Sequence, residues 1–317
     1  MKVIDIIKGD HKPFASFELV PPLKGSDINK LYASIEPLME FNPPFINMTA
    51  HRDETEFRQL PDGSFKKITV TKRPGSVAIA AAIMKRFHVE VVPHIICGGS
   101  TKWEIENTLL DLNFLDIKNV VALRGDSVPG EKYFAPTPDG HSHSNELVAQ
   151  ISNMNRGKYL DNTLKDAVPT NFCIGVAGYP EKHCEAPNLD IDIENLKRKV
   201  EAGADYIITQ MFFDNNKFFE FVDKCRAAGI TVPIIPGVKP ISTHKHIELL
   251  PQAFSIDLPQ DLMKEILKCK DDSQIYSVGI EWCTAQCKEL LAHGAKAIHF
   301  YTMGKADNVR EIIRRAF

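Results

Sequence analysis

The sequence predicts a (β/α)8 barrel, the α/β fold also called a TIM barrel, as a single domain over residues 1–317. Short apolar runs alternate along the chain with amphipathic stretches, as in βαβ units around a parallel sheet. The apolar runs number eight and are nearly continuous, which indicates strands buried on both faces. The length also fits, because barrels of this kind often exceed about 250 residues as one domain.

The expected strands are short runs rich in β-branched and aromatic residues. In chain order they are Phe14–Val20, Phe45–Ala50, Glu90–Cys97, Asn119–Arg124, Phe172–Tyr179, Tyr206–Phe212, Val232–Val238 and Ala297–Tyr301. The helices expected between them include Asp27–Phe41, Val77–Phe87, Thr101–Phe114, Asp190–Ala202, Asn215–Ala228 and Ser273–Leu291. Three helices are followed by glycine (Gly203, Gly229 and Gly294), which suits a left-handed residue at a helix end.

A doubly wound dinucleotide-binding sheet is the alternative fold. Such a sheet normally carries G-x-G-x-x-G after its first strand, whereas Val20 is followed here by Pro-Pro-Leu-Lys-Gly. The closed barrel is therefore favoured.

Two loops that follow strands are long. Residues 51–76 contain Pro61-Asp62-Gly63 between Phe57–Leu60 and Phe65–Thr71, which predicts a small hairpin projecting from the barrel. Residues 125–143 are rich in Gly, Pro and His. Because loops after barrel strands lie on the catalytic face, both are candidate lids or cofactor walls, and a surface insertion without function is the competing interpretation of the first.

Composition excludes several classes of protein. No apolar stretch approaches the length of a membrane span, and charges in residues 1–10 interrupt any signal-peptide core. The seven cysteines form no C-x-x-C pair. The net charge of −3 gives no indication of a nucleic-acid or membrane partner. We therefore expect a cytoplasmic protein with reduced thiols that acts on small molecules.

Polar residues stand at the carboxyl ends of the expected strands, where a barrel of this kind does its chemistry. In strand order they are Glu18, Thr49, His94, Arg124 with Asp126, Tyr179 with His183, Gln210, Lys239 and Tyr301. A purely structural barrel would prefer Val, Ile or Leu at these positions.

Glu18 is the first candidate for a catalytic acid. It lies within the apolar run Ala-Ser-Phe-Glu-Leu-Val, where an unpaired carboxylate is costly to desolvate. Desolvation raises the pKa of a carboxyl group, which makes glutamate a proton donor near neutral pH. A structural ion pair with a barrel Arg or Lys is the competing interpretation.

Three further patterns suggest ligand contacts. Arg124-Gly125-Asp126 would allow a heterocycle to approach the backbone closely, but it is also typical of an ordinary turn. Gln210 beside Phe212-Phe213 could hydrogen-bond a flat nitrogen heterocycle, or it could be an amide satisfied within the core. The third pattern lies on helix 190–202. Asp192, Asn195 and Lys199 share one face of it, usually a solvated one, and there Arg198 and Lys199 would hold a phosphate or carboxylate if the helix borders the site.

The pairs His141-x-His143 and His244-x-His246 invite a metal interpretation. No spaced carboxylate or cysteine completes a ligand set, so we expect no metal site.

Taken together, these segments resemble the methylenetetrahydrofolate reductase family, in its bacterial form of a catalytic domain alone. The matching segments run in order across nearly the whole chain. They are Ser16-Phe17-Glu18 with Pro21-Pro22, Asn47-Met48-Thr49, Pro93-His94, Ala122-Leu123-Arg124-Gly125-Asp126, Val176-Ala177-Gly178-Tyr179-Pro180 with His183 and Glu185-Ala186, Leu196-Lys197-Arg198-Lys199, Ala202-Gly203-Ala204, Ile208-Thr209-Gln210 with Phe212-Phe213, Ile235-Pro236-Gly237, and His299-Phe300-Tyr301-Thr302.

The resemblance implies an FAD-dependent enzyme in which NADH or NADPH reduces the flavin and 5,10-methylenetetrahydrofolate then accepts the hydride, the two substrates taking turns in one site. It implies that Glu18 protonates N10 of the folate, that Asp126 lies between flavin and pterin, and that Gln210 and Tyr301 contact the folate. The residues implied for FAD are Thr49, His94, Leu123, Arg124, Gly125, Asp126, Tyr179, His183, Asp192, Asn195, Arg198 and Lys199.

The chain departs from the family pattern in places. After Tyr301-Thr302 the family commonly has Asn-Arg, and here Lys305 keeps the charge for the glutamate tail of the folate without the arginine fork. Segment 143–147 lacks the Tyr-Ala of many members, and loop 51–76 is longer than in the shorter ones. The chain ends at Phe317 without the regulatory domain of eukaryotic members, so inhibition by adenosylmethionine is not expected; a homo-oligomer is expected because the family forms them.

Two other functions remain open from the residues. A lyase or aldolase barrel could use Lys239 as a Schiff-base amine, since a lysine at a strand end suits that chemistry. A folate- or flavin-binding protein without catalysis is the other, although Glu18 and Asp126 argue against it.

Overall fold

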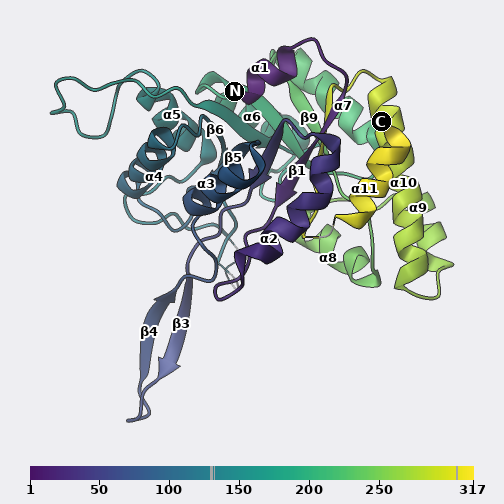
Figure 1. Ribbon diagram of the computed structural model, residues 1–317, viewed down its shortest axis with the longest axis horizontal. Helices are drawn as coiled ribbons and strands as arrows, with labels where there is room; N and C mark the ends of the chain where they lie inside the picture. Colours follow the sequence, from purple (N-terminus) through teal and green to yellow (C-terminus); the bar gives the residue numbers. More distant parts are fainter. Residues whose placement is uncertain (129–130, 132, 305) are drawn as a thin grey trace.

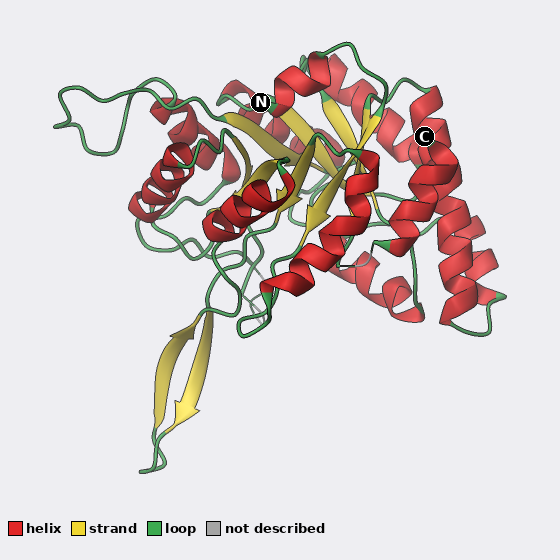
Figure 2. Cartoon of the chain, in the orientation of Figure 1, coloured by secondary structure: helices red, strands yellow, loops and turns green. Residues whose placement is uncertain are grey.

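Eight parallel strands close into one barrel, with helices packed around it (Figures 1 and 2). The computed structural model describes residues 1–128, 131, 133–304 and 306–317. Around the barrel the strands follow the order β1 (Phe14–Leu19), β10 (Ala297–Tyr301), β9 (Ile234–Val238), β8 (Tyr206–Met211), β7 (Cys173–Gly178), β6 (Asn119–Leu123), β5 (Glu90–Ile96) and β2 (Phe45–Met48). The eight predicted strands and the predicted barrel are confirmed.

The described helices form the outer layer. They are α2 (Ile28–Ile35), α3 (Ser76–Phe87), α4 (Lys102–Phe114), α5 (Ser144–Met154), α6 (Leu189–Glu201), α7 (Asn215–Ala227), α8 (His244–Phe254), α9 (Gln260–Leu267), α10 (Asp272–Ala292) and α11 (Asp307–Ala316). None of the helices in the described part of the chain is long and apolar enough to cross a membrane.

Five of the six predicted helices are confirmed, and the sixth is not continuous. The stretch predicted as one helix, Asp27–Phe41, consists of α2 followed by a 3-10 helix, η1 (Glu36–Phe41). Pro37 lies in the first turn of η1 and has no N–H to continue the α-helical hydrogen bonds, which explains the change. Gly203, Gly229 and Gly294 all have positive φ, so the predicted helix ends are confirmed.

The amino-terminal end of the barrel is closed by the short helix α1 (Val3–Lys8). Val3 and Ile7 are buried in a cluster with inward-facing residues near the starts of the strands, among them Phe45 and Tyr206. The backbone N–H of Val3 donates to Asn119 Oδ1 at 2.8 Å, which ties α1 to β6. We call this apolar cluster the floor of the barrel.

The predicted hairpin in loop 51–76 is confirmed and extends well away from the barrel. Its strands are β3 (Glu54–Gln59) and β4 (Phe65–Val70), paired antiparallel, and the turn contains Gly63 at φ 82°. Figure 1 shows the hairpin and α1 at opposite ends of the molecule.

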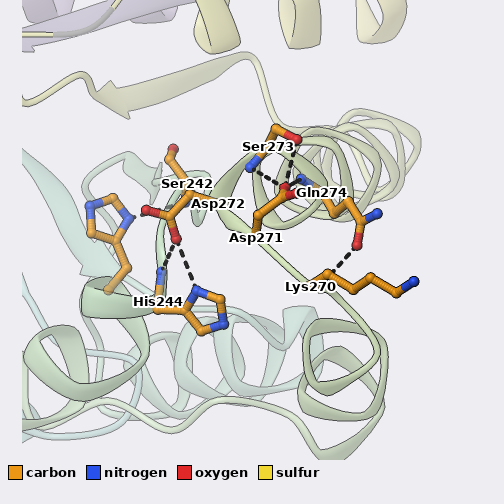
Figure 3. Close-up of polar contacts among 8 residues, drawn as sticks. Ser242, His244, Lys270, Asp271, Asp272, Ser273 and Gln274 are labelled. Carbon is orange, nitrogen blue, oxygen red and sulfur yellow. Dashed lines mark hydrogen bonds and ion pairs between the residues drawn. The ribbon is translucent and has the colours of Figure 1, made fainter.

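The histidine pair at 244 and 246 has a structural role. The backbone N–H and the ring Nδ1 of His244 both contact Asp272 Oδ1 at 2.9 Å, which joins the start of α8 to the start of α10 (Figure 3). Beside it, Asp271 accepts from the backbone N–H groups of Ser273 and Gln274 and so caps α10. Among the described residues, no three His, Cys, Asp or Glu side chains lie close enough to hold a metal ion.

Candidate active site

Above the floor, the barrel interior becomes polar. Phe17 and Leu19 of β1 pack outward against the helices, so the alternation of the strand directs Ser16 and Glu18 inward. Neighbouring strands add Asn47, His94 and His299, which with Ser16 are at most 4% exposed. Ser16, Asn47 and His299 had no role predicted from the sequence; the signal that could have found them is a polar residue at an inward position of an apolar strand.

Glu18 lies at the centre of this polar layer with its side chain 19% exposed. Burial raises the pKa of Glu18 from 4.5 to about 8, so the carboxyl group is protonated at neutral pH. The nearest titratable partner is His94, whose Nε2 lies 3.6 Å from Glu18 Oε2. Burial, and to a smaller extent His51, lowers the pKa of His94 to about 3. Both groups are therefore neutral, so Glu18 and His94 do not form an ion pair.

A second uncharged histidine, His299, belongs to the same polar layer. Burial, with a smaller contribution from His94, lowers the pKa of His299 to about 3, and its Nδ1 lies 2.9 Å from Ser16 Oγ. His299 Nε2 and Asn47 Oδ1 are buried without a hydrogen-bond partner among the described residues. A buried polar atom that lacks a partner is costly, so these atoms suit contact with a polar ligand.

Tyr301, the last residue of β10, lies at the edge of this polar layer. Its hydroxyl donates to the carbonyl oxygen of Thr209 at 2.7 Å. Gly237 makes this contact possible, because a Cβ at position 237 would lie 2.7 Å from the tyrosine ring and 2.2 Å from the same carbonyl oxygen. Next to it, Gln210 Oε1 accepts from the backbone N–H of Met211 at 2.9 Å, and its side chain is half-buried.

At the end of β6, Arg124 makes a bidentate pair with Glu185. The distances from its two terminal nitrogens to the carboxylate oxygens are 2.6 and 2.7 Å, and the guanidinium lies 4.9 Å from the centre of the Phe134 ring. Gly125 follows with φ 85°, and Asp126 comes directly after it. The carboxylate of Glu185 holds Arg124 at the rim of the barrel. Because the two residues are 61 apart in sequence, no local pattern could have indicated this pair.

The loop after β7 is joined to α6 by buried polar contacts. Asp192 accepts from the backbone N–H of His183 at 2.9 Å and is 8% exposed, while Lys199 donates to the carbonyl oxygen of Ala177 at 3.0 Å. The interpretation of this helix face as solvated is therefore wrong for Asp192 and Lys199, because the face packs against the end of β7. Asn195, by contrast, contacts the exposed Arg198 at 3.3 Å.

Lys199 is a cation held in a low-dielectric position. Burial lowers its pKa to about 8, with Asp192 opposing and Arg124 adding to the decrease. Its Nζ lies 5.7 Å from the centre of the Tyr179 ring, and that ring contacts His183 edge to face at 4.9 Å. An anion bound here would favour the charged form of Lys199, so the site suits phosphate or carboxylate.

The remaining predicted residues lie as follows. Thr49 follows β2, with Oγ1 3.1 Å from His51 Nε2, and Leu123 ends β6, its carbonyl accepting from the backbone N–H of Cys97 at 3.1 Å. Lys239 follows β9, is 4% exposed and interacts with neighbouring groups. The prediction for Lys305 lies outside the described residues.

Comparisons with known proteins agree on one family. The family model described as methylenetetrahydrofolate reductase matches residues 2–316. The Escherichia coli 5,10-methylenetetrahydrofolate reductase is 31% identical over 92% of this chain and 86% of its own length. Methylenetetrahydrofolate reductase (NADH) 1 of Arabidopsis thaliana is 32% identical over 96% of this chain but 48% of its own. The chain thus spans about half the length of several of the curated relatives that it matches, the Arabidopsis thaliana protein among them.

A solved structure shares the fold. An uncharacterized protein from Clostridium thermocellum, described as binding two copies of 5-methyl-5,6,7,8-tetrahydrofolic acid, superimposes with a TM-score of 0.55 at 14% identity. The superposition covers 98% of this chain and 96% of that protein. At this identity the likeness supports the barrel alone.

Proposed function

The chain belongs to the methylenetetrahydrofolate reductase family, and from this we propose that it reduces 5,10-methylenetetrahydrofolate to 5-methyltetrahydrofolate with NADH or NADPH as donor. The observation that carries the proposal is Glu18, a carboxylic acid kept protonated at the mouth of the barrel, in the same layer as two neutral histidines. Reduction of this folate needs both a hydride and a proton, and Glu18 supplies the second.

We propose that FAD binds along the ends of β2, β5, β6 and β7 and the face of α6. The chemistry of the donors fits it. Arg124, Arg198 and Lys199 supply positive charge for a diphosphate, and the residues proposed to complete the site are Thr49, His94, Leu123, Gly125, Asp126, Tyr179, His183, Asp192 and Asn195. When bound, FAD carries the hydride from the nicotinamide to the folate.

The role proposed for Glu18 is general acid catalysis. Its proton passes to N10 of the folate, the bond between N10 and the bridging carbon breaks, and that carbon becomes the electrophile that accepts the hydride. A pKa of about 8 leaves Glu18 able to donate at neutral pH, whereas an exposed glutamate would already be ionised. Burial is thus what makes this residue an acid.

The other proposed contacts orient the substrates. Asp126, at the rim after Gly125, would lie between flavin and pterin, and Gln210 with Tyr301 would contact the folate. Lys305 is proposed for the glutamate tail. A cytoplasmic location and the assignment of residues 1–317 as one FAD-binding catalytic domain remain predictions.

The proposal is tested by mixing experiments on the purified protein after incubation with FAD. Under anaerobic conditions, NADH and NADPH are compared as reductants of the bound flavin, and the reduced protein is then mixed with 5,10-methylenetetrahydrofolate. We expect bleaching of the flavin absorbance by at least one donor and its return with the folate. Protein that takes up no FAD would contradict the proposal, and trapping of a carbonyl substrate on Lys239 by borohydride would favour a lyase instead. Flavin uptake without either half-reaction would indicate a binding protein.

A further inference from the structure

The β3–β4 hairpin carries exposed aromatic side chains on a face that nothing in the described structure covers. Residues 55, 57 and 59 of β3 and 65, 67 and 69 of β4 share this face, on which Phe57 is 67% and Phe65 65% exposed. An isolated two-stranded hairpin is marginally stable in water, and exposed aromatic side chains on one face add to its cost. The hairpin projects from the body of the molecule, as Figure 1 shows, so the rest of the described chain does not shield it.

The two strands have unpaired backbone edges as well. In the described part of the chain this sheet contains only β3 and β4, so each strand leaves one edge with free N–H and C=O groups, which is a template for another strand. The other face of the hairpin carries Glu54, Glu56 and Arg58 on β3 and Lys66 on β4. These charges restrict which strand can pair with which.

When β3 pairs with β3 of a second copy, one register places residues of opposite charge opposite each other. In an antiparallel pair of identical strands, the two-fold axis passes between one residue and the same residue of the second copy, and we call this the residue at the axis. With Phe57 on the axis, Glu56 lies opposite Arg58 of the second copy, and the same contact recurs on the other side. An axis at Thr55 would oppose Glu54 to Glu56, and an axis at Glu56 or Arg58 would oppose that residue to itself.

The β4 edge offers no such solution. It carries Lys66 and Lys67 and no acidic residue, so a second β4 supplies no opposite charge in any register. Cross-strand pairs of opposite charge and of aromatic residues stabilise a sheet, and like charges directly opposite destabilise it. The β3 edge is therefore the one suited to a second copy of this chain.

We propose that two copies of this chain associate through their β3 strands, forming a four-stranded sheet centred on Phe57, with two Glu56–Arg58 contacts across the interface. Glu56 also pairs with Lys72 of its own chain, which holds the base of the hairpin in place for the partner. The interface lies on the arm and not on the barrel. Its test is consequently independent of the proposed reductase activity.

The test measures molecular mass in solution by sedimentation and light scattering. Arg58→Glu sets two carboxylates opposite each other at both contacts, and we expect it to halve the mass of the wild-type assembly or to raise its dissociation constant at least about tenfold. Glu56→Arg alone should have the same effect. The double variant Glu56→Arg with Arg58→Glu should restore association, and so should an equimolar mixture of the two single variants. Lys66→Glu, on the same face of the hairpin but on β4, is the matched control and should keep the wild-type mass.

Two results would overturn the proposal. A wild-type protein that stays at 35.6 kDa at all concentrations has no such interface. A wild-type oligomer whose mass is unchanged by both single reversals associates through another surface; if those variants instead alter only the KM for folate, the hairpin acts as a lid.

Discussion

The two ends of the barrel interior are built from the same strands and by the same alternation, yet they have opposite chemistry. At the floor, inward positions carry Phe45, Tyr206 and other largely apolar side chains, closed by Val3 and Ile7 of α1. Further along β1, β2, β5 and β10, the inward positions are polar instead: Ser16, Glu18, Asn47, His94 and His299.

This difference separates stability from chemistry within one core. The floor removes large apolar side chains from water and so supplies folding energy. The polar layer desolvates groups that would rather be hydrated, and the result is an acid with a raised pKa beside histidines with lowered ones. Changes at the floor should therefore alter stability with little effect on the site. Changes at the mouth should alter the chemistry of the site first, and their effect on stability should depend on pH where they remove Glu18.

The largest effect is expected at the mouth, from Glu18→Gln. The amide keeps the size of the side chain but has no acidic proton, so the rate of folate reduction should fall by about 10²- to 10⁴-fold. Reduction of the flavin by NADH should remain nearly unchanged, since it needs no proton from Glu18. Single-turnover measurement of each half-reaction checks this, and survival of both at wild-type rates would place the acid elsewhere.

At the floor, Phe45→Ala should lower the free energy of unfolding by about 3–5 kcal/mol, because it leaves a cavity at a fully buried site. Urea denaturation measures the loss. Phe114→Ala is the control, since Phe114 is 87% exposed and its removal should change stability by no more than about 0.5 kcal/mol. Equal losses from both variants would contradict the assignment of Phe45 to a packed floor.

A smaller effect is expected from Lys199→Met, which removes the buried cation beside Tyr179. The dissociation constant for FAD should rise about 10- to 100-fold, the usual cost of losing a hydrogen bond to a charged group. Fluorescence titration with FAD measures it. Lys197→Met, two residues earlier on the same helix but exposed and paired with Glu201, should leave the affinity unchanged.

The last expected effect is a pH dependence of stability that belongs to Glu18. Its pKa is 4.5 in the unfolded chain and about 8 in the folded one, so unfolding releases a proton between these values. The free energy of unfolding should therefore fall as pH rises through this window, by up to about 1.4 kcal/mol per pH unit for this one group. Glu18→Gln removes the slope, so the variant should gain stability relative to wild type toward pH 8. If the free energies of unfolding of wild type and Glu18→Gln instead changed in parallel with pH, Glu18 would be ionised in the folded protein.

Local sequence patterns were sufficient for the barrel and insufficient for the contacts at its mouth. Continuous apolar runs located the eight strands of the barrel, and Pro-Asp-Gly located the hairpin. Each of these signals lies within a few neighbouring residues of the sequence. The helix break at Pro37 was missed because the apolar pattern continues through it. The pairing of Arg124 with Glu185 and of Asp192 with the backbone of His183 arises only when segments distant in sequence meet at the mouth.

The apolar run around Glu18 predicted a raised pKa for its carboxyl group, and the pKa of about 8 agrees with that prediction. The uncharged state of the histidines in the same layer was not predicted. It depends on burial within the closed barrel, which lowers the pKa of His94 on β5 and of His299 on β10 to about 3.

The low pKa values of His94 and His299 have a consequence for how the acid is recharged. The proposed reaction consumes one proton in every cycle, and after each transfer Glu18 is left as a carboxylate. Neither histidine is a cation at neutral pH, and the floor below is apolar, so neither the two histidines nor the floor offers a charged proton donor to Glu18. We therefore expect water to deliver the next proton through the mouth of the barrel, after the product has left. Substrates and protons would therefore enter by the same route. A solvent isotope effect should appear in the folate half-reaction, in which Glu18 transfers its proton, and not in the nicotinamide half-reaction.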